Sequence, residues 1–275
     1  MNFLIGHLIT LNYCFFLFFI LFTAVKSETE QKEQDIELYY AYSVNKTYHS
    51  KIDVVYRDFY IVTRTELGKH QVDSVYIHHE RKNDIYWGNI PASRNSSIIH
   101  NNTNITIWSA HLQWTSLGSP FEYADSFAVT CKKGNVSYWD NNQLHNYKIS
   151  INDGYFIGSS WNIKVQSIDG VYNKAQKLFY LYGQVLVRNI DFSKVITVMF
   201  KLGDEEFQSE KANFYSSQNN FGIEKWKYQI RKDNITSEPK IVVAKFHYKV
   251  KGKEYIDDNF NSNYLVPLRI INSKK

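Results

Sequence analysis

Residues 126–147 read SFAVTCKKGNVSYWDNNQLHNY, and residues 243–264 read VAKFHYKVKGKEYIDDNFNSNY. The two stretches match at positions 117 residues apart, among them Tyr138 and Tyr255, Asp140 and Asp257, Asn146 and Asn263, and Tyr147 and Tyr264. Further upstream, Trp108 and Trp226 lie 118 residues apart. A repeat at a fixed period indicates that one structural unit occurs twice. We therefore expect two copies, over residues 36–150 and 161–268, joined by turn-forming residues between about 150 and 160.

Short runs of alternating apolar residues recur along the chain, as in Val72–Ile77, Ile105–Trp108 and Val195–Phe200. Aromatic residues make up 16% of the sequence, and they favour strands, as β-branched residues do. No window of eleven or more residues holds a helical apolar period. Many short strands with turn signals between them predict an all-β sandwich for each copy.

The N-terminal segment is apolar, because residues 1–25 contain no Asp, Glu, Lys or Arg and charge resumes at Lys26. Val25 and Ser27 stand where a signal cleavage site has its small residues. We interpret residues 1–27 as a secretory signal peptide, which predicts a secreted or cell-surface protein with no membrane segment after cleavage. An uncleaved signal anchor is the alternative, since about 20 apolar residues can span a bilayer.

Two further features fit secretion. Six Asn-x-Ser/Thr sequons are candidate N-glycosylation sites: Asn45, Asn95, Asn101, Asn104, Asn135 and Asn234. Cys14 is removed with the signal peptide, so the mature chain has one thiol, Cys131, and forms no internal disulfide. Cys131 lies between apolar neighbours in a strand-like run, which favours a buried, unreactive thiol.

Charge and motifs argue against several function classes. The formal net charge is +5 with acids and bases well mixed, and no Lys/Arg block follows the pattern of a nucleic-acid binder. No nucleophile-elbow, P-loop, zinc-protease or paired-cysteine motif occurs. His78 and His79 are adjacent on an expected strand and therefore point to opposite faces, which makes them poor joint metal ligands. We expect no cofactor, no metal and no nucleic-acid partner.

The closing residues of both copies, and the stretch VRNIDFSKVITV at 187–198, resemble carbohydrate-binding module family 21. This family includes starch-binding modules of fungal glucoamylases and glycogen-targeting subunits of a protein phosphatase. The resemblance extends over nearly all of the mature chain. It implies two tandem immunoglobulin-like antiparallel β-sandwiches, and a non-catalytic protein whose partner is an α-1,4-glucan such as starch or glycogen.

The resemblance also implies a sugar site in the first copy, formed by Trp87, Trp139, Asp140, Asn141 and Asn146. Flat aromatic rings stack on the apolar C–H faces of sugars, and a few polar groups fix the orientation of the ligand. Trp139 stands beside Asp-Asn-Asn in a turn, which is a poor position for burial. A core role for Trp87 and Trp139 is the alternative, and Trp108, within an Ile-Thr-Ile-Trp strand, is predicted to be core.

The second copy departs from the family pattern at two positions, since Ile256 replaces the stacking aromatic residue and Asp258 replaces an Asn. The resemblance implies these contacts there: Phe192, Lys194, Phe207, Asp257 and Asn263. In the first copy the position of Phe192 falls near Lys69, so this second type of site is expected to be lost there. We hypothesise one usable site per copy, the closing loop in the first and the Phe192 face in the second. The alternative is a second copy that serves only as a structural partner.

Three other functions remain to be weighed. An enzyme is disfavoured, because two binding modules fill the chain and leave no room for a catalytic domain. A phosphatase-targeting subunit is disfavoured, because no basic-Val-x-Phe docking segment occurs and the expected signal peptide points to another compartment. A surface or cell-wall protein that binds another polysaccharide or a protein stays open, as does pairing with a separate hydrolase or a cell-wall component.

Overall fold

The computed structural model describes residues 35–48, 52–81, 87–116, 123–151, 153–218, 221–235 and 237–272. Within these ranges the chain folds into strands without an α-helix, which confirms the all-β prediction. Residues 1–27, the expected signal peptide, lie outside the described ranges. None of the described segments forms a helix of the length and apolarity needed to span a membrane.

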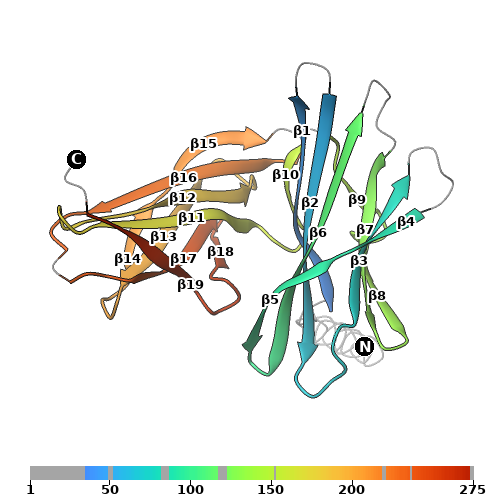
Figure 1. The fold of residues 1–275 in the computed structure, drawn as a ribbon, viewed down its shortest axis with the longest axis horizontal. Helices are drawn as coiled ribbons and strands as arrows, with labels where there is room; N and C mark the ends of the chain where they lie inside the picture. The colour runs from blue at the N-terminus through green and yellow to red at the C-terminus, as the bar shows by residue number, and fades with distance from the viewer. Residues whose placement is uncertain are drawn as a thin grey trace, which may run out of the picture. The chain divides into compact units, whose positions relative to one another are not determined.

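The first sandwich, blue to yellow-green in Figure 1, consists of two antiparallel sheets. One sheet has the order β10-β1-β2-β6-β5, and the other has the order β4-β3-β7-β8 with β9 also paired to β7. Its strands are β1 Ile36–Tyr48, β2 Ile52–Glu66, β3 Ser74–Arg81, β4 Trp87–Pro91, β5 Ser93–His100, β6 Thr103–Ser116, β7 Tyr123–Lys133, β8 Val136–Asp140, β9 Tyr147–Lys148 and β10 Gly154–Ile157. Strand β10 lies in the segment expected to be a turn-rich join, and it extends the first sheet by pairing with β1.

The second sandwich is yellow to red in Figure 1, and pairing joins its strands into one nine-stranded sheet. Its strands follow the order β14-β13-β17-β19-β11-β12-β16-β15, with β18 also paired to β17. They are β11 Ile163–Asn173, β12 Leu178–Arg188, β13 Lys194–Leu202, β14 Gln208–Lys211, β15 Asn213–Gln218, β16 Ile223–Lys232, β17 Ile241–Val250, β18 Lys253–Asp257 and β19 Tyr264–Ile271. The sandwich departs from a purely antiparallel pattern because β11 pairs with β19 in parallel.

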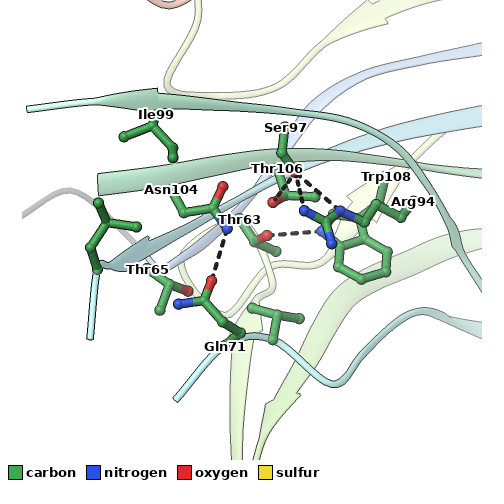
Figure 2. A pocket seen from close by; sticks show the side chains of 11 residues that line it. Thr63, Thr65, Gln71, Arg94, Ser97, Ile99, Asn104, Thr106 and Trp108 are labelled. Atoms are coloured by element: carbon green, nitrogen blue, oxygen red, sulfur yellow. Dashed lines mark hydrogen bonds between the residues drawn. The ribbon is translucent and has the colours of Figure 1, made fainter. Parts of the chain in front are cut away.

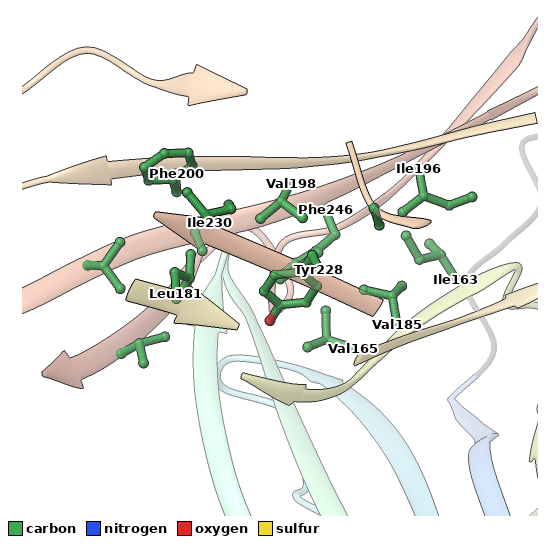
Figure 3. Close-up of a cluster of buried hydrophobic side chains, with 14 of the residues drawn as sticks. Ile163, Val165, Leu181, Val185, Ile196, Val198, Phe200, Tyr228, Ile230 and Phe246 are labelled. Atoms are coloured by element: carbon green, nitrogen blue, oxygen red, sulfur yellow. The ribbon is translucent and has the colours of Figure 1, made fainter. Parts of the chain in front are cut away.

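Alternation of side chains along the strands builds both cores. In β13, for example, Ile196, Val198 and Phe200 are buried, because successive side chains of a strand point to opposite faces. Figure 3 shows these residues packed against Val185, Phe246 and other side chains of the second core. The first core includes Cys131, which has no exposed surface, and burial raises the pKa of its thiol to about 11. The expectation of a buried, weakly nucleophilic thiol therefore agrees with the structure.

Candidate functional site

Three aromatic side chains gather on the outer face of the sheet β4-β3-β7-β8. The rings of His78 and Trp87 stack, with centroids 5.0 Å apart and planes 14° from parallel. The ring of Trp139 meets His78 edge-on, with centroids 5.2 Å apart. Trp87 is 37% exposed and Trp139 is 47% exposed. We call Trp87, His78 and Trp139 the aromatic platform.

Strand periodicity explains why these rings face solvent. Val75 and Ile77 on β3 are buried, so His78 points to the opposite, outer face. On β8, Tyr138 packs against the first core, and the next residue, Trp139, points outward. The pairing of β3 with β4 places Asn89 opposite His78, and the imidazole Nδ1 lies 2.7 Å from the amide oxygen of Asn89.

The platform brings together the two tryptophans that were predicted to stack on sugar, and it adds a residue that the sequence analysis did not assign. His78 was considered only as a metal ligand together with His79. The structure separates the two, because His79 is buried and His78 is partly exposed. Alternation after Ile77 was the signal that His78 faces outward, but nothing in the sequence places it between Trp87 and Trp139.

The platform can offer a flat, apolar surface edged by the polar atoms of His78 and Asn89. Aromatic rings carry large apolar faces, and a pyranose presents C–H groups to such a face. Among the described residues, no group of three or more His, Cys, Asp or Glu side chains is arranged to hold a metal ion. The arrangement therefore suits binding by stacking and hydrogen bonding rather than by coordination.

Asp140, predicted to contact sugar, instead holds the closing loop to the sandwich. It is 5% exposed, and its Oδ2 accepts hydrogen bonds from the Leu38 N–H at 2.8 Å and the Tyr147 hydroxyl at 2.7 Å. Its Oδ1 accepts the Asn142 N–H at 3.2 Å. With both oxygens engaged by the protein, Asp140 has a structural role, which differs from the prediction.

Asp257 does the same in the second sandwich, where it is 7% exposed. Its carboxylate accepts hydrogen bonds from the Val165 N–H at 2.6 Å and from the Tyr264 hydroxyl at 2.7 Å. The Asn259 N–H also donates to it, at 3.4 Å. The repeated Asp-x-Asn…Asn-Tyr motif therefore encodes one loop structure twice, and its carboxylates are not free for a ligand.

The asparagines of these loops serve mainly the turn. Asn146 and Asn263 have φ of 53° and 56°, in the left-handed region that Asn tolerates better than most residues. Their carbonyl oxygens accept the side-chain amides of Asn142 and Asn259. The Oδ1 of Asn141 accepts the Leu144 N–H at 3.0 Å. Within the described ranges the side-chain amides of Asn146 and Asn263 bond to no protein group, so these two stay available as predicted polar contacts.

The residues predicted to form the Phe192 face divide into an exposed ring and a buried ion pair. Phe192 is 99% exposed. The Lys194 ammonium lies 2.8 Å from the Glu224 carboxylate, with side chains only 4% and 10% exposed, and it also bonds to Asn189. Glu224 in turn accepts the indole N–H of Trp226 at 3.0 Å. Lys194 therefore stabilises the structure beneath this face through a buried ion pair, which differs from its predicted contact with sugar.

Strand register identifies the counterpart of the aromatic platform in the second sandwich. His78 pairs with Ala128 and Met199 pairs with Lys245, and Ala128 and Lys245 are 117 residues apart, so Met199 occupies the position of His78. Phe207 is the counterpart of Trp87, and Ile256 is the counterpart of Trp139. Phe207 is partly buried between the ammonium groups of Lys201 and Lys245, and Ile256 is 47% exposed. One aromatic ring thus remains where the first sandwich has three.

Where the second sandwich has its buried ion pair, the first has a polar pocket of about 330 Å³ (Figure 2). Trp108 is 9% exposed at its wall and donates its indole N–H to Thr63 at 2.8 Å, in agreement with its predicted core position. Arg94 donates to Ser97, and the Asn104 amide donates to Gln71 at 2.8 Å. The pocket has no exposed aromatic ring among its described lining residues.

Comparison with known proteins finds a family match for part of the chain. Residues 162–267, within the second sandwich, match the family described as carbohydrate/starch-binding module (family 21). A solved structure of the starch-binding domain of Rhizopus oryzae glucoamylase, in complex with β-cyclodextrin and maltoheptaose, is 24% identical. That match covers 40% of this chain and 97% of the other, with a TM-score of 0.33. No curated protein matches the chain.

Proposed function

We propose that the chain is a secreted, non-catalytic protein made of two tandem family 21 modules that bind α-1,4-glucan, with the aromatic platform as its main site. The observation that carries the proposal is the exposed row of Trp87, His78 and Trp139 on a sandwich that shares its closing-loop network with the family-matched half. Exposed aromatic rings beside a few polar groups are the usual means by which a module holds a sugar chain.

The assignment of residues 36–150 as a second module of the same family rests on internal geometry. Both sandwiches have a β-bulge in their first strand, between Leu38 and Tyr40 and between Val165 and Ser167. The N–H of Leu38 and that of Val165 each donate to the Asp of the closing loop. Agreement of a bulge and a buried hydrogen bond at matching positions supports descent of both halves from one unit.

Secretion is proposed from the apolar N-terminal segment and the sequons. Three sequon asparagines lie in exposed turns or hairpins, as an oligosaccharide requires: Asn101, Asn135 and Asn234. Asn45 and Asn104 are partly buried in strands, and Asn104 donates to Gln71. Asn95 is also exposed, but it lies within strand β5. We propose the three exposed sites outside the strands as the ones that carry glycans.

The test is binding of the protein, produced from its full-length sequence, to insoluble starch, with cellulose and chitin as controls. Retention on starch that maltoheptaose competes away is expected. Trp87→Ala and Trp139→Ala should each weaken maltoheptaose binding at least tenfold, which corresponds to about 1.4 kcal/mol. Tyr48→Ala removes a 41% exposed tyrosine outside the platform and should bind as the wild type does. If the folded wild-type protein is not retained on starch, the α-glucan assignment is wrong.

A second candidate is a surface or cell-wall protein that keeps the fold and binds a different polysaccharide or a protein. It is favoured by the second sandwich, where Met199 and Ile256 replace two rings of the platform. Retention on cellulose or chitin, but not on starch, would support this function. Retention by none of the three would favour a protein ligand.

A further inference from the structure

The second sandwich carries an open groove on the outer face of the sheet formed by β11, β12, β16 and β15, with a volume of about 760 Å³. Strand pairing arranges the side chains of the groove floor in two rows. Asp169, Tyr182 and Gln229 stand opposite one another across β11, β12 and β16. Ser167, Gln184 and Lys227 form the next row. We call this surface the sheet groove.

Two tyrosines supply aromatic surface on the two sides of the sheet groove. Tyr182 is 36% exposed and Tyr215 is 55% exposed. Strand β16 lies between their strands β12 and β15, so their backbones are about two strand spacings, roughly 10 Å, apart. The Lys227 ammonium lies 3.2 Å from the centroid of the Tyr215 ring, which fixes that ring by a cation–π contact.

The polar groups between these rings have no partner within the described part of the protein. The amides of Gln184, Gln229 and Asn213 and the carboxylate of Asp169 take part in no hydrogen bond or ion pair with described residues. An amide both donates and accepts, and so does each hydroxyl group of a sugar. The carboxylate of Asp169 and the ammonium of Lys227 give the groove one charge of each sign, so its charge favours neither anions nor cations. Neutral hydroxyl-rich chains are the ligands that this set of groups fits best.

A glycine and two β-bulges shape the backbone beneath the sheet groove. The Tyr228 hydroxyl donates to the Ser167 carbonyl oxygen at 3.1 Å, and a Cβ at Gly183 would lie only 2.1 Å from that oxygen and 2.5 Å from the hydroxyl. Glycine at 183 therefore permits the hydrogen bond that ties β16 to the bulge of β11. Bulges re-aim side chains in a strand, and a second bulge between Phe214 and Ser216 does so on β15.

The first sandwich shows what closes such a face. Ser167, the first residue after the bulge, faces Gln184, and the matching pair in the first sandwich is Tyr40 and Tyr60. Their rings stack at 4.2 Å and fill the surface. The tyrosine of β10, Tyr155, stacks on Tyr42 at 4.4 Å beside them. Small and amide side chains in place of stacked rings are what open the groove in the second sandwich.

We propose that the sheet groove is a further glucan-binding site, which takes an α-1,4-glucan chain between Tyr182 and Tyr215 with hydroxyls on Gln184 and Gln229. It lies on a different surface from the aromatic platform, on a different sandwich. This inference rests on the proposed function for its choice of glucan. A site in each sandwich raises the avidity for a long polymer without any new contact at the platform.

The test follows the side-chain amide resonances of Gln184 and Gln229 by NMR in the full protein, titrated with maltoheptaose and, separately, with cellohexaose. Both resonances should shift saturably with maltoheptaose, and they should do so equally in Trp87→Ala/Trp139→Ala. Tyr182→Ala should weaken the response of the groove at least tenfold without changing that of the platform. Gln229→Ala, an exposed substitution, is the second variant, and Tyr48→Ala is the matched control.

The outcomes separate the two proposals. If the Gln184 and Gln229 resonances do not shift while the platform still binds maltoheptaose, the groove proposal is wrong and the proposed function stands. Groove shifts in a protein whose platform tryptophans do not respond overturn the platform alone. A groove that responds only to cellohexaose overturns its assignment to α-glucan. If neither surface responds to the added sugars, both proposals are wrong.

Discussion

The Tyr147 hydroxyl donates to the Asp140 carboxylate at 2.7 Å, and both residues are buried. The same carboxylate oxygen also accepts the Leu38 N–H, from a strand 102 residues earlier in the sequence. One side chain thus ties the last loop of the sandwich to its first strand. The identical pairing of Tyr264 with Asp257 shows that this tie, rather than a ligand, accounts for the most regular part of the repeat.

Asp140→Ala should destabilise the first sandwich while leaving maltoheptaose affinity per folded molecule unchanged. The substitution leaves two buried donors without an acceptor, at about 1–3 kcal/mol each. Tyr147→Phe removes only the hydroxyl and should cost about 1 kcal/mol. Urea unfolding measures both free energies, and calorimetric titration measures the affinity. Stability near that of the wild type, with affinity reduced, would instead make Asp140 a ligand contact.

His78→Ala should weaken sugar binding severalfold, because His78 lies between Trp87 and Trp139 and touches both rings. His78→Phe keeps a flat ring at this position and should retain most of the affinity. A role through the Asn89 hydrogen bond alone predicts the opposite, since His78→Phe would then bind as poorly as His78→Ala. Intrinsic tryptophan fluorescence during titration with maltoheptaose distinguishes the two, and unchanged Tm values serve as the folding control.

Sequence alone predicted the all-β fold and the exposure of Trp87 and Trp139, because these depend on local patterns: strand periodicity and turn residues. It did not predict the roles of Asp140 and Lys194, whose partners Leu38 and Glu224 are distant in sequence. Polar residues in a binding motif look alike whether they face a ligand or the protein. The sheet groove was missed for a similar reason, since its rows form only when β11, β12 and β16 align.

Lys194→Met should destabilise the second sandwich by about 3–5 kcal/mol, because it leaves the buried Glu224 carboxylate without its counter-ion. Lys174→Met is the matched control: Lys174 pairs with Glu238 at 2.7 Å, but the pair is exposed and contributes little to stability. Phe192→Ala should leave stability unchanged. Chemical unfolding of the three variants tests this ranking of their free energies of unfolding. A Lys194→Met protein as stable as the control would contradict the stabilising role of Lys194.

Alkaline pH should unfold the protein through its buried tyrosines. Burial raises the pKa of Tyr147 and Tyr228, and it raises the pKa of Tyr248 to about 12. These phenols stay protonated in the folded chain, whereas in the unfolded chain they lose the proton near pH 10. Above pH 10 the unfolded state therefore binds fewer protons than the folded state, and the free energy of unfolding falls by about 1.4 kcal/mol per pH unit for each such tyrosine.

Urea unfolding between pH 8 and pH 11.5 measures this slope, and absorbance at 295 nm reports how many tyrosines ionise before unfolding. Tyr228→Phe removes one titrating group and should lower the slope above pH 10 by about 1.4 kcal/mol per pH unit. The variant also loses the hydrogen bond to Ser167 and starts from a lower stability at pH 8, so the two effects separate along the pH axis. A variant whose curve runs parallel to that of the wild type would show that Tyr228 ionises as readily in the folded chain as in the unfolded one.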